Sequence, residues 1–208
     1  MPLVAIPGLR EAREREAQRR LLAFADVPRS LCGVDVLPLT PRMFFALELT
    51  ESPFAVGGKI TPAAVGMLVW IASVERSRPA PRLLLPGWLD RRKRRIGAKV
   101  GVWPFMDAVY RCRKFVEEAF ADGAGGGTSA DSPGAVASGL AAQVDFIASQ
   151  YGWPEAAILD TPVSRLFQYQ RLAIRRMDPK AALSNPESDK AKADFLKASN
   201  QAQDEPKP

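Results

Sequence analysis

Histidine is absent from this 208-residue chain, and cysteine occurs only twice, at Cys32 and Cys112. Without histidine, the chain has no catalytic triad of the Ser-His-Asp type, no histidine general base and no imidazole ligand for a metal ion. The two cysteines do not form a CxxC pair, which excludes the usual zinc sites. A disulfide between them is an alternative, but we expect reduced thiols in a cytosolic protein, where structural disulfides are rare.

Long apolar segments are also missing. A helix that crosses a bilayer needs roughly 20 consecutive apolar residues, and no segment of the chain is that long. Residues 1–8 are followed by a charged segment, which is not typical of a signal peptide. We therefore expect neither a membrane-spanning segment nor an export signal.

Motifs for catalysis are missing as well. The chain contains no GxSxG sequence and no pair of carboxylates at a catalytic spacing. The glycines at 125–127 lack the strand, the lysine and the helix that surround a phosphate-binding loop, so we interpret them as part of a linker. The sequence therefore predicts that the protein is not an enzyme and binds no cofactor or metal.

Residues 60–74 form the segment around which the rest of the sequence is organised, and they contain no charged residue. Thr61 and Pro62 supply a helix N-cap and a proline in the first turn. Apolar residues then repeat at helical spacing in two stripes: Val65, Leu68, Val69 and Ala72, and Met67, Trp70, Ile71 and Val74. A helix that is apolar on every side is predicted to be buried on every side.

Further helices are predicted over residues 9–25, 41–51, 88–100 and 104–120. The second of these begins at another Thr-Pro pair, and the last has an apolar stripe at Phe105, Val109, Cys112, Val116 and Phe120. Residues 30–39 are expected to form a small hairpin or an extended segment. Three prolines exclude a continuous helix over 75–87, where the leucines at 83–85 are expected to anchor the chain to the core. Cys112 is interpreted as a small core residue.

The predicted fold class is mainly α, in four parts. Residues 1–121 form a helical core domain that includes the charged N-terminal helix. Residues 122–139 contain six glycines and no large apolar side chain, which predicts a flexible linker. Residues 140–179 form a small unit of three helices, the third of which is capped by Thr161 and Pro162. Residues 180–208 form a polar tail, with a helix over 187–199 and disorder from Gln201.

Positive charge is concentrated in one region. The net charge is +6, and residues 82–114 contain ten basic and two acidic side chains. The densest part is the run of Arg91, Arg92, Lys93, Arg94 and Arg95, with Trp88 and Trp103 as the nearby aromatic residues. Nucleic-acid phosphates would suit such a run. A solvated basic face and a contact with an acidic protein are the alternatives.

The three helices of residues 140–179 are also compatible with a helix-turn-helix arrangement. In that interpretation, the base-reading side chains are those on the third helix: Arg165, Gln168, Gln170 and Arg171. Short helices joined by tight turns are a common scaffold, however, so the unit does not by itself indicate DNA binding.

Two segments resemble a known family when they are taken together. Residues 38–73 carry the pattern PLT…L…SPF.VGG, followed by an apolar helix that ends near Trp-x-x-Ser. Residues 151–176 carry the pattern YGW…IL..P..RLFQ. Both are similar to small helical proteins of tailed-phage structural gene clusters that are assigned as tail assembly chaperones. Together they cover about a third of the chain.

The resemblance implies a non-enzymatic assembly factor in the host cytoplasm, which holds the tape-measure or tail-tube protein until the tail polymerises. It implies no catalytic residue. The basic segment 88–100 and the glycine-rich linker lie outside the two matching segments. Two alternatives stay open: a nucleic-acid-binding protein that uses the 91–95 run, and a structural component of the virion neck or tail.

Overall fold

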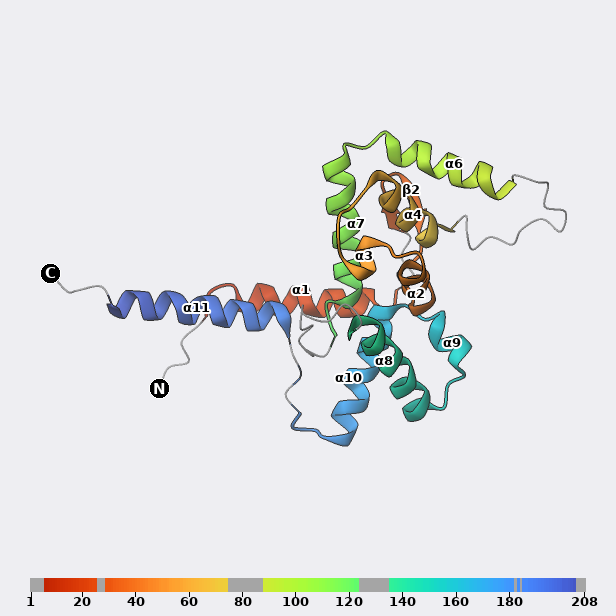
Figure 1. Ribbon diagram of the computed structural model, residues 1–208. Coiled ribbons are helices and arrows are strands. Elements are labelled where there is room, and N and C mark those ends of the chain that lie inside the picture. The colour runs from red at the N-terminus through yellow and green to blue at the C-terminus, as the bar shows by residue number, and fades with distance from the viewer. Residues whose placement is uncertain are drawn as a thin grey trace.

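The computed structural model describes residues 6–25, 29–74, 88–123, 135–181, 183 and 185–204. For residues 88–90, 92, 135–138, 186 and 199–204, the description covers the backbone alone. Helices dominate the described chain, which confirms the predicted mainly α fold class. Figure 1 shows a helical body and an arm, formed by the first and last helices, that extends from it.

A short antiparallel hairpin follows the first helix. The chain runs through α1 (Leu9–Leu22) into β1 (Arg29–Leu31) and β2 (Val34–Val36), so residues 30–39 adopt the hairpin alternative. The turn consists of Cys32, with φ of 51°, and Gly33, with φ of 72°. Positive φ at both turn residues is typical of a type I′ turn. Glycine adopts this conformation freely, whereas another residue there costs about 1 kcal/mol or more.

The first two Thr-Pro pairs, at 40–41 and 61–62, begin helices, as predicted. They start α2 (Pro41–Leu49) and α4 (Pro62–Ala72), and the single turn α3 (Pro53–Val56) lies between them. The Thr40 hydroxyl accepts a hydrogen bond from the Met43 backbone N–H at 3.3 Å, and Thr61 accepts one from Ala64 at 3.2 Å. Each threonine hydroxyl thus accepts a hydrogen bond from a backbone N–H group of the first helical turn, which has no partner within the helix.

The main hydrophobic core is built around α4. One of its predicted stripes is completely buried, at Val65, Leu68, Val69 and Ala72. The second stripe is buried at Trp70 and Ile71, but Met67 is 36% exposed. The prediction of burial on every side is therefore wrong on the side of α4 that carries Met67. The neighbours of α4 are α2, α3, α6, α7 and β2, and they leave the Met67 side uncovered.

Two helices close the main core. In α6 (Trp88–Gly101), Ile96 and Val100 are buried, and the helix packs on α4. In α7 (Phe105–Phe120), Val109 and Cys112 are buried as predicted. Phe105 is instead 41% exposed, because the buried face of α7 is rotated toward Phe115.

A smaller cluster lies in the second half of the chain, between α8 (Ala135–Tyr151), α9 (Glu155–Leu159) and α10 (Val163–Met177). It consists of Val144, Ile147, Ile158 and Leu166. Three other residues of α8 and α10 belong to the main core: Leu140, Val163 and Phe167. Gly152 follows the last residue of α8 with φ of 63°, a conformation that favours glycine. Thr161 does not cap α10, because Pro162 is the N-cap residue and no side chain caps this helix. The Thr161 hydroxyl instead donates to the Ala157 carbonyl at 2.8 Å.

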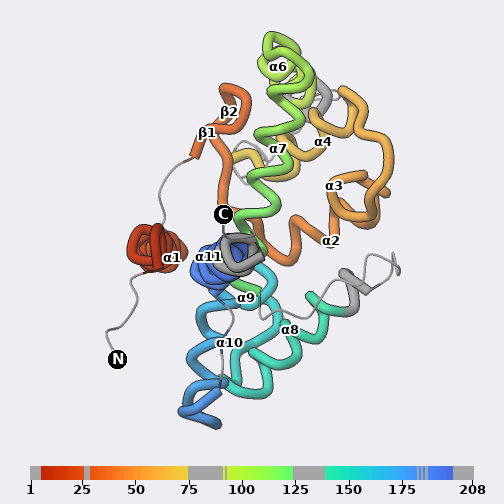
Figure 2. Tube along the Cα trace, turned by 90° about the vertical axis from the view of Figure 1, so that its left-hand side faces the viewer, coloured from red at the N-terminus to blue at the C-terminus, as the bar shows by residue number. Residues whose placement is uncertain are grey.

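The arm pairs α1 with the last helix, α11 (Pro186–Asp204). The two lie side by side in Figure 1, and Figure 2 looks along them. The helix predicted over 187–199 is thus present, and it continues through residues 201–204, for which disorder was expected. Residues 205–208, the predicted loop at 75–87 with its leucine anchor, and residues 124–134 of the linker predicted over 122–139 lie outside the described residues. The end of that predicted linker is helical instead, because α8 already begins at Ala135.

A carboxylate in the middle of α4 tests the central role of this helix. Leu68 is completely buried, so Leu68→Asp should destabilise the fold by about 4 kcal/mol or more and abolish the cooperative thermal transition seen by circular dichroism. Met67→Asp is the matched control on the same helix and should melt close to the unmodified protein. A Leu68→Asp protein that still melts cooperatively would show that α4 is not the core helix.

Candidate functional site

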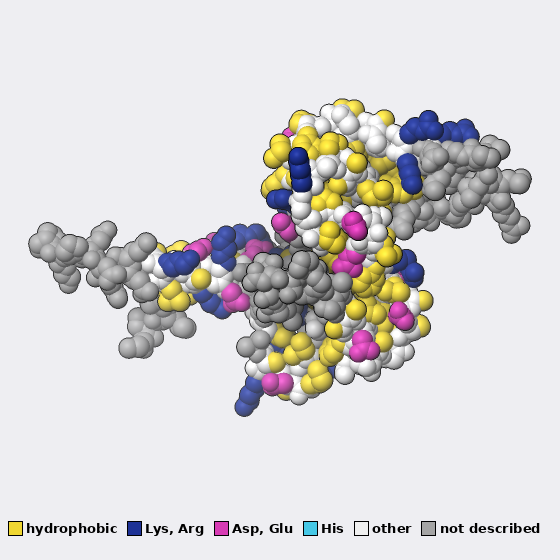
Figure 3. All heavy atoms as spheres, viewed as in Figure 1, with side chains coloured by type: hydrophobic (Ala, Val, Ile, Leu, Met, Phe, Trp, Pro, Cys, Tyr) yellow, Lys and Arg dark blue, Asp and Glu magenta, His cyan; other side chains and the backbone are white. Residues whose placement is uncertain are grey.

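The basic run lies on α6, where Figure 3 shows Lys and Arg side chains gathered on the surface. Its described side chains are all exposed: Arg91, Lys93, Arg94 and Arg95. Ile96, the next residue in the sequence, is buried on the side of α6 that packs against α4. Because residues three and four apart share a helix face, Arg91, Arg94 and Arg95 lie together, opposite Ile96. The side chains of Trp88 and Arg92 are not described.

Several cations elsewhere in the chain are paired with carboxylates. On α2, for example, Arg42 Nε lies 2.6 Å from Asp160 Oδ1. Within the described ranges, no salt bridge or side-chain hydrogen bond involves Arg91, Lys93 or Arg94. The fold therefore does not neutralise these three charges with described side chains, and an anionic partner could do so.

Three of the four candidate side chains of α10 bind within the chain, and the fourth, Gln170, is half-buried. Gln168 is 6% exposed and donates from Nε2 to Asp122 Oδ2 at 3.0 Å. Arg165 donates from Nε to the Ala23 carbonyl at 3.0 Å. Arg171 is 8% exposed. These side chains therefore make contacts inside the fold and do not form an exposed base-reading face, because Gln168 and Arg171 are buried.

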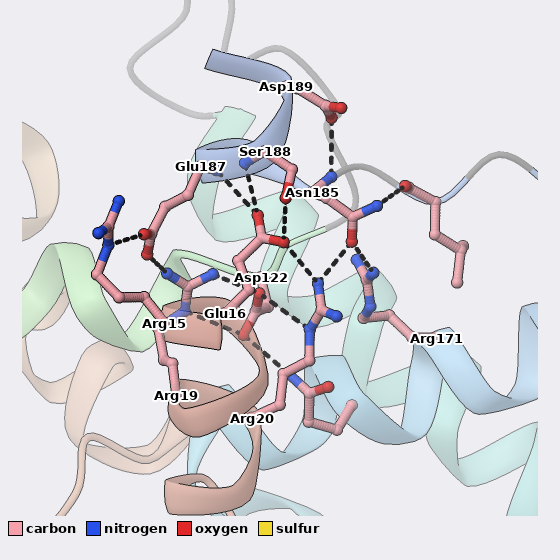
Figure 4. A network of polar contacts seen from close by, with 12 residues as sticks. Arg15, Glu16, Arg19, Arg20, Asp122, Arg171, Asn185, Glu187, Ser188 and Asp189 are labelled. Atoms are coloured by element: carbon pink, nitrogen blue, oxygen red, sulfur yellow. Dashed lines mark hydrogen bonds and ion pairs between the residues drawn. The ribbon is translucent and has the colours of Figure 1, made fainter. Parts of the chain in front are cut away.

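A buried polar network at the base of the arm includes Gln168 and Arg171 (Figure 4). Its first centre is Glu16 of α1, which is 3% exposed. Glu16 Oε1 accepts hydrogen bonds from the backbone N–H groups of Glu187 and Ser188 at 2.9 and 3.1 Å, and Oε2 accepts the Ser188 hydroxyl at 2.8 Å. The first N–H groups of a helix have no partner inside it, and the helix dipole favours a carboxylate there. Glu16 therefore caps α11 from another helix.

Asp122 is the second centre of the network, and it is also 3% exposed. Besides Gln168, it binds Arg19, whose Nη2 lies 2.8 Å from Oδ1. Arg19 also binds Glu187 at 2.5 Å. Burial alone would lower the pKa of Arg19, but the hydrogen bond to Asp122 and the charges of Asp122, Glu187 and Glu16 outweigh burial and raise it. Asp122, predicted to begin a linker, thus joins α1, α7 and α10.

Asn185, immediately before α11, completes the network. Its Oδ1 accepts hydrogen bonds from Arg20 at 2.6 Å and from Arg171 at 3.0 Å. Burial, followed by the charge of Arg20, lowers the pKa of Arg171. Arginine nevertheless stays protonated in proteins, so the buried cation depends on acceptors such as this amide oxygen. The network therefore ties the arm to α10 as well as to α7.

An apolar surface lies at the start of α7. Its four side chains are all solvent-exposed: Val102 at 84%, Phe105 at 41%, Met106 at 72% and Tyr110 at 66%. We call these residues the α7 patch. Figure 3 shows hydrophobic side chains gathered over this end of α7. Met106 and Tyr110 are four positions apart and so share the outer face of the helix. Methionine and aromatic residues are enriched at protein–protein interfaces.

A cleft of about 630 Å³ lies between α1, α7 and the hairpin. Leu39 and Phe115 line it, and Arg29 and Glu118 pair beside it at 3.1 Å. Across the described parts of the chain, no three acidic or cysteine side chains are arranged to hold a metal ion. None of the described helices is long and apolar enough to span a membrane.

Removing the Glu16 carboxylate should loosen the arm. Glu16→Ala leaves two backbone donors and the Ser188 hydroxyl without an acceptor, which should cost about 2 kcal/mol. We expect faster amide hydrogen exchange in α11, measured by mass spectrometry, with exchange in α4 unchanged. Glu14→Ala is the control, because Glu14 pairs with Arg10 on the exposed side of α1. Unchanged protection of α11 in Glu16→Ala would contradict the capping role.

Compared with known proteins, the chain matches no protein-family model, and no curated protein or solved structure is significantly similar to it. The resemblance to tail assembly chaperones is therefore a prediction from two sequence segments. The surfaces described above are the other basis for inferring a function.

Proposed function

We propose that this protein is a non-enzymatic assembly factor that acts through protein–protein contacts, in the manner of a phage tail assembly chaperone. The α7 patch is the observation that supports the proposal best. Large apolar side chains that are contiguous on a surface mark interaction sites, because water disfavours leaving them exposed. A partner that covers Met106 and Tyr110 would remove their apolar surface from water.

The proposed partner is the tape-measure or tail-tube protein encoded in the same gene cluster, as the resemblance of residues 38–73 and 151–176 implies. Assembly requires binding that is later reversed. The patch suits this requirement, since small interfaces give weaker and more transient complexes than large ones. Met106 also has a flexible, polarisable side chain that can adapt to different apolar surfaces. The patch would be vacated when the partner polymerises.

The double variant Met106→Glu/Tyr110→Glu tests this role. Charges at the centre of an interface should reduce co-purification with the co-expressed tape-measure or tail-tube protein about tenfold or more. Leu49→Glu is the control, because Leu49 is 86% exposed on α2 and lies outside the patch. Thermal melting should be similar for all three proteins.

Two outcomes would count against the proposal. Undiminished co-purification of the double variant would exclude the patch as the binding surface. Stoichiometric recovery of the chain in purified virions would replace the chaperone role by that of a structural component of the neck or tail.

Nucleic-acid binding is the second candidate, and the unpaired cations of α6 favour it. Phosphates would release counterions when they meet Arg91, Lys93 and Arg94, so binding should weaken steeply with salt. The triple variant with serine at these positions should bind duplex DNA about tenfold more weakly at low salt, as measured by fluorescence anisotropy.

A matched control removes the same charge elsewhere. Arg10, Arg13 and Arg175 are also exposed, and serine at these three positions should leave DNA affinity nearly unchanged. Equal losses in both triple variants would indicate net charge alone, and no loss in the α6 variant would reject this candidate.

A further inference from the structure

The fold brings the two cysteines of the chain into contact. Cys32 lies in the hairpin turn and Cys112 in the middle of α7, and their side chains are 1% and 0% exposed. Both are free thiols in this structure, both belong to the main hydrophobic core, and each shifts the pKa of the other. Nothing in their sequence spacing predicts this contact, because it depends on how the hairpin packs on α7.

The conformation of the turn is a second, independent observation. Cys32 occupies the first central position of a turn with positive φ at both residues, where Asn, Asp or Gly is favoured. Backbone strain of this kind is a reason to look for a function of the side chain. The turn lies close to Trp103, whose Nε1 is 3.6 Å from the position that a Cβ on Gly33 would take.

We propose that Cys32 and Cys112 are a reversible dithiol–disulfide site, which in its oxidised form joins the hairpin covalently to α7. The oxidant is a small disulfide such as oxidised glutathione. This proposal does not rest on the proposed assembly function, since it concerns thiols in the core rather than either exposed surface.

The reaction proceeds through two exchange steps. The Cys32 thiolate attacks one sulfur of the oxidant, which breaks its S–S bond and releases one small thiol. The Cys112 thiolate then attacks the Cys32 sulfur of the mixed disulfide and releases the second small thiol. The protein loses two protons and two electrons, and one small disulfide becomes two thiols.

Cys32 is the thiol that reacts first. It lies at the tip of a hairpin with three residue pairs, which can open locally more easily than the middle of α7. Burial raises the pKa of the Cys32 thiol, while the hydrogen bond with Cys112 and the charge of Arg111 oppose this rise. Burial raises the pKa of Cys112 to about 12. Since the thiolate is the nucleophile, oxidation should be slow at neutral pH and faster at alkaline pH.

The cross-link would close a long loop that contains α2, α4 and α6. Closing such a loop restricts the unfolded chain far more than the folded one. The oxidised protein should therefore melt about 10 °C higher than the reduced protein.

The test uses the full chain, incubated in dilute solution with oxidised glutathione at neutral and at alkaline pH. Acid quenching, unfolding and alkylation should show that both thiols become protected together. Peptide mapping should find a Cys32–Cys112 linkage, and a reducing agent should reverse both this linkage and the rise in melting temperature. Cys112→Ala is the control and should stop at the glutathione adduct of Cys32, with no rise in melting temperature.

Three results would overturn the proposal. The first is that both thiols still alkylate fully after oxidation. The second is that glutathione adducts or intermolecular dimers form in place of the internal linkage. The third is that the linkage forms only in denaturant. The mass measurement on the unmodified chain is decisive even if a cysteine variant fails to fold.

Discussion

Burial of α4 is the constraint on which the rest of the structure depends. Its stripe of Val65, Leu68, Val69 and Ala72 has no exposed surface, and such burial requires a neighbour on several sides. α2, α6, α7 and β2 supply those neighbours. Because removal of apolar surface from water is the main favourable term in folding, these contacts determine where α6 and α7 lie. The outward faces of α6 and α7 then carry the basic run and the α7 patch.

The arm is held by a different kind of interaction. Glu16 joins α1 to α11, and Asp122 joins α1 to the body. Both carboxylates are nearly inaccessible to water. A buried carboxylate is costly unless every oxygen finds donors, and here backbone N–H groups, a hydroxyl and arginines supply them. Such a network is specific in geometry, since a small displacement leaves charges unpaired. It fixes the direction of the arm, whereas the apolar core fixes the body.

Local signals in the sequence predict much of the body and little of the network. Thr40 and Thr61 mark helix starts because a cap depends on residues three positions away, and Gly152 marks a helix end for the same local reason. Glu16 bonds to residues more than 170 positions along the chain, and nothing in its charged surroundings distinguishes it from Glu14. Arg171 and Gln168 resemble exposed polar residues in the sequence, and only tertiary packing places them inside.

The position of α7 connects the features discussed above. One face places Cys112 in the core, the opposite face carries Met106 and Tyr110, and Asp122 follows its last turn. The helix has 16 residues and is therefore about 24 Å long. α7 runs from the end of α6 toward the arm (Figure 1), so the α7 patch at its start and Asp122 after its last turn lie at opposite ends of this length. A partner can therefore cover the patch without displacing the arm, while a Cys32–Cys112 bond would brace the helix between these two ends.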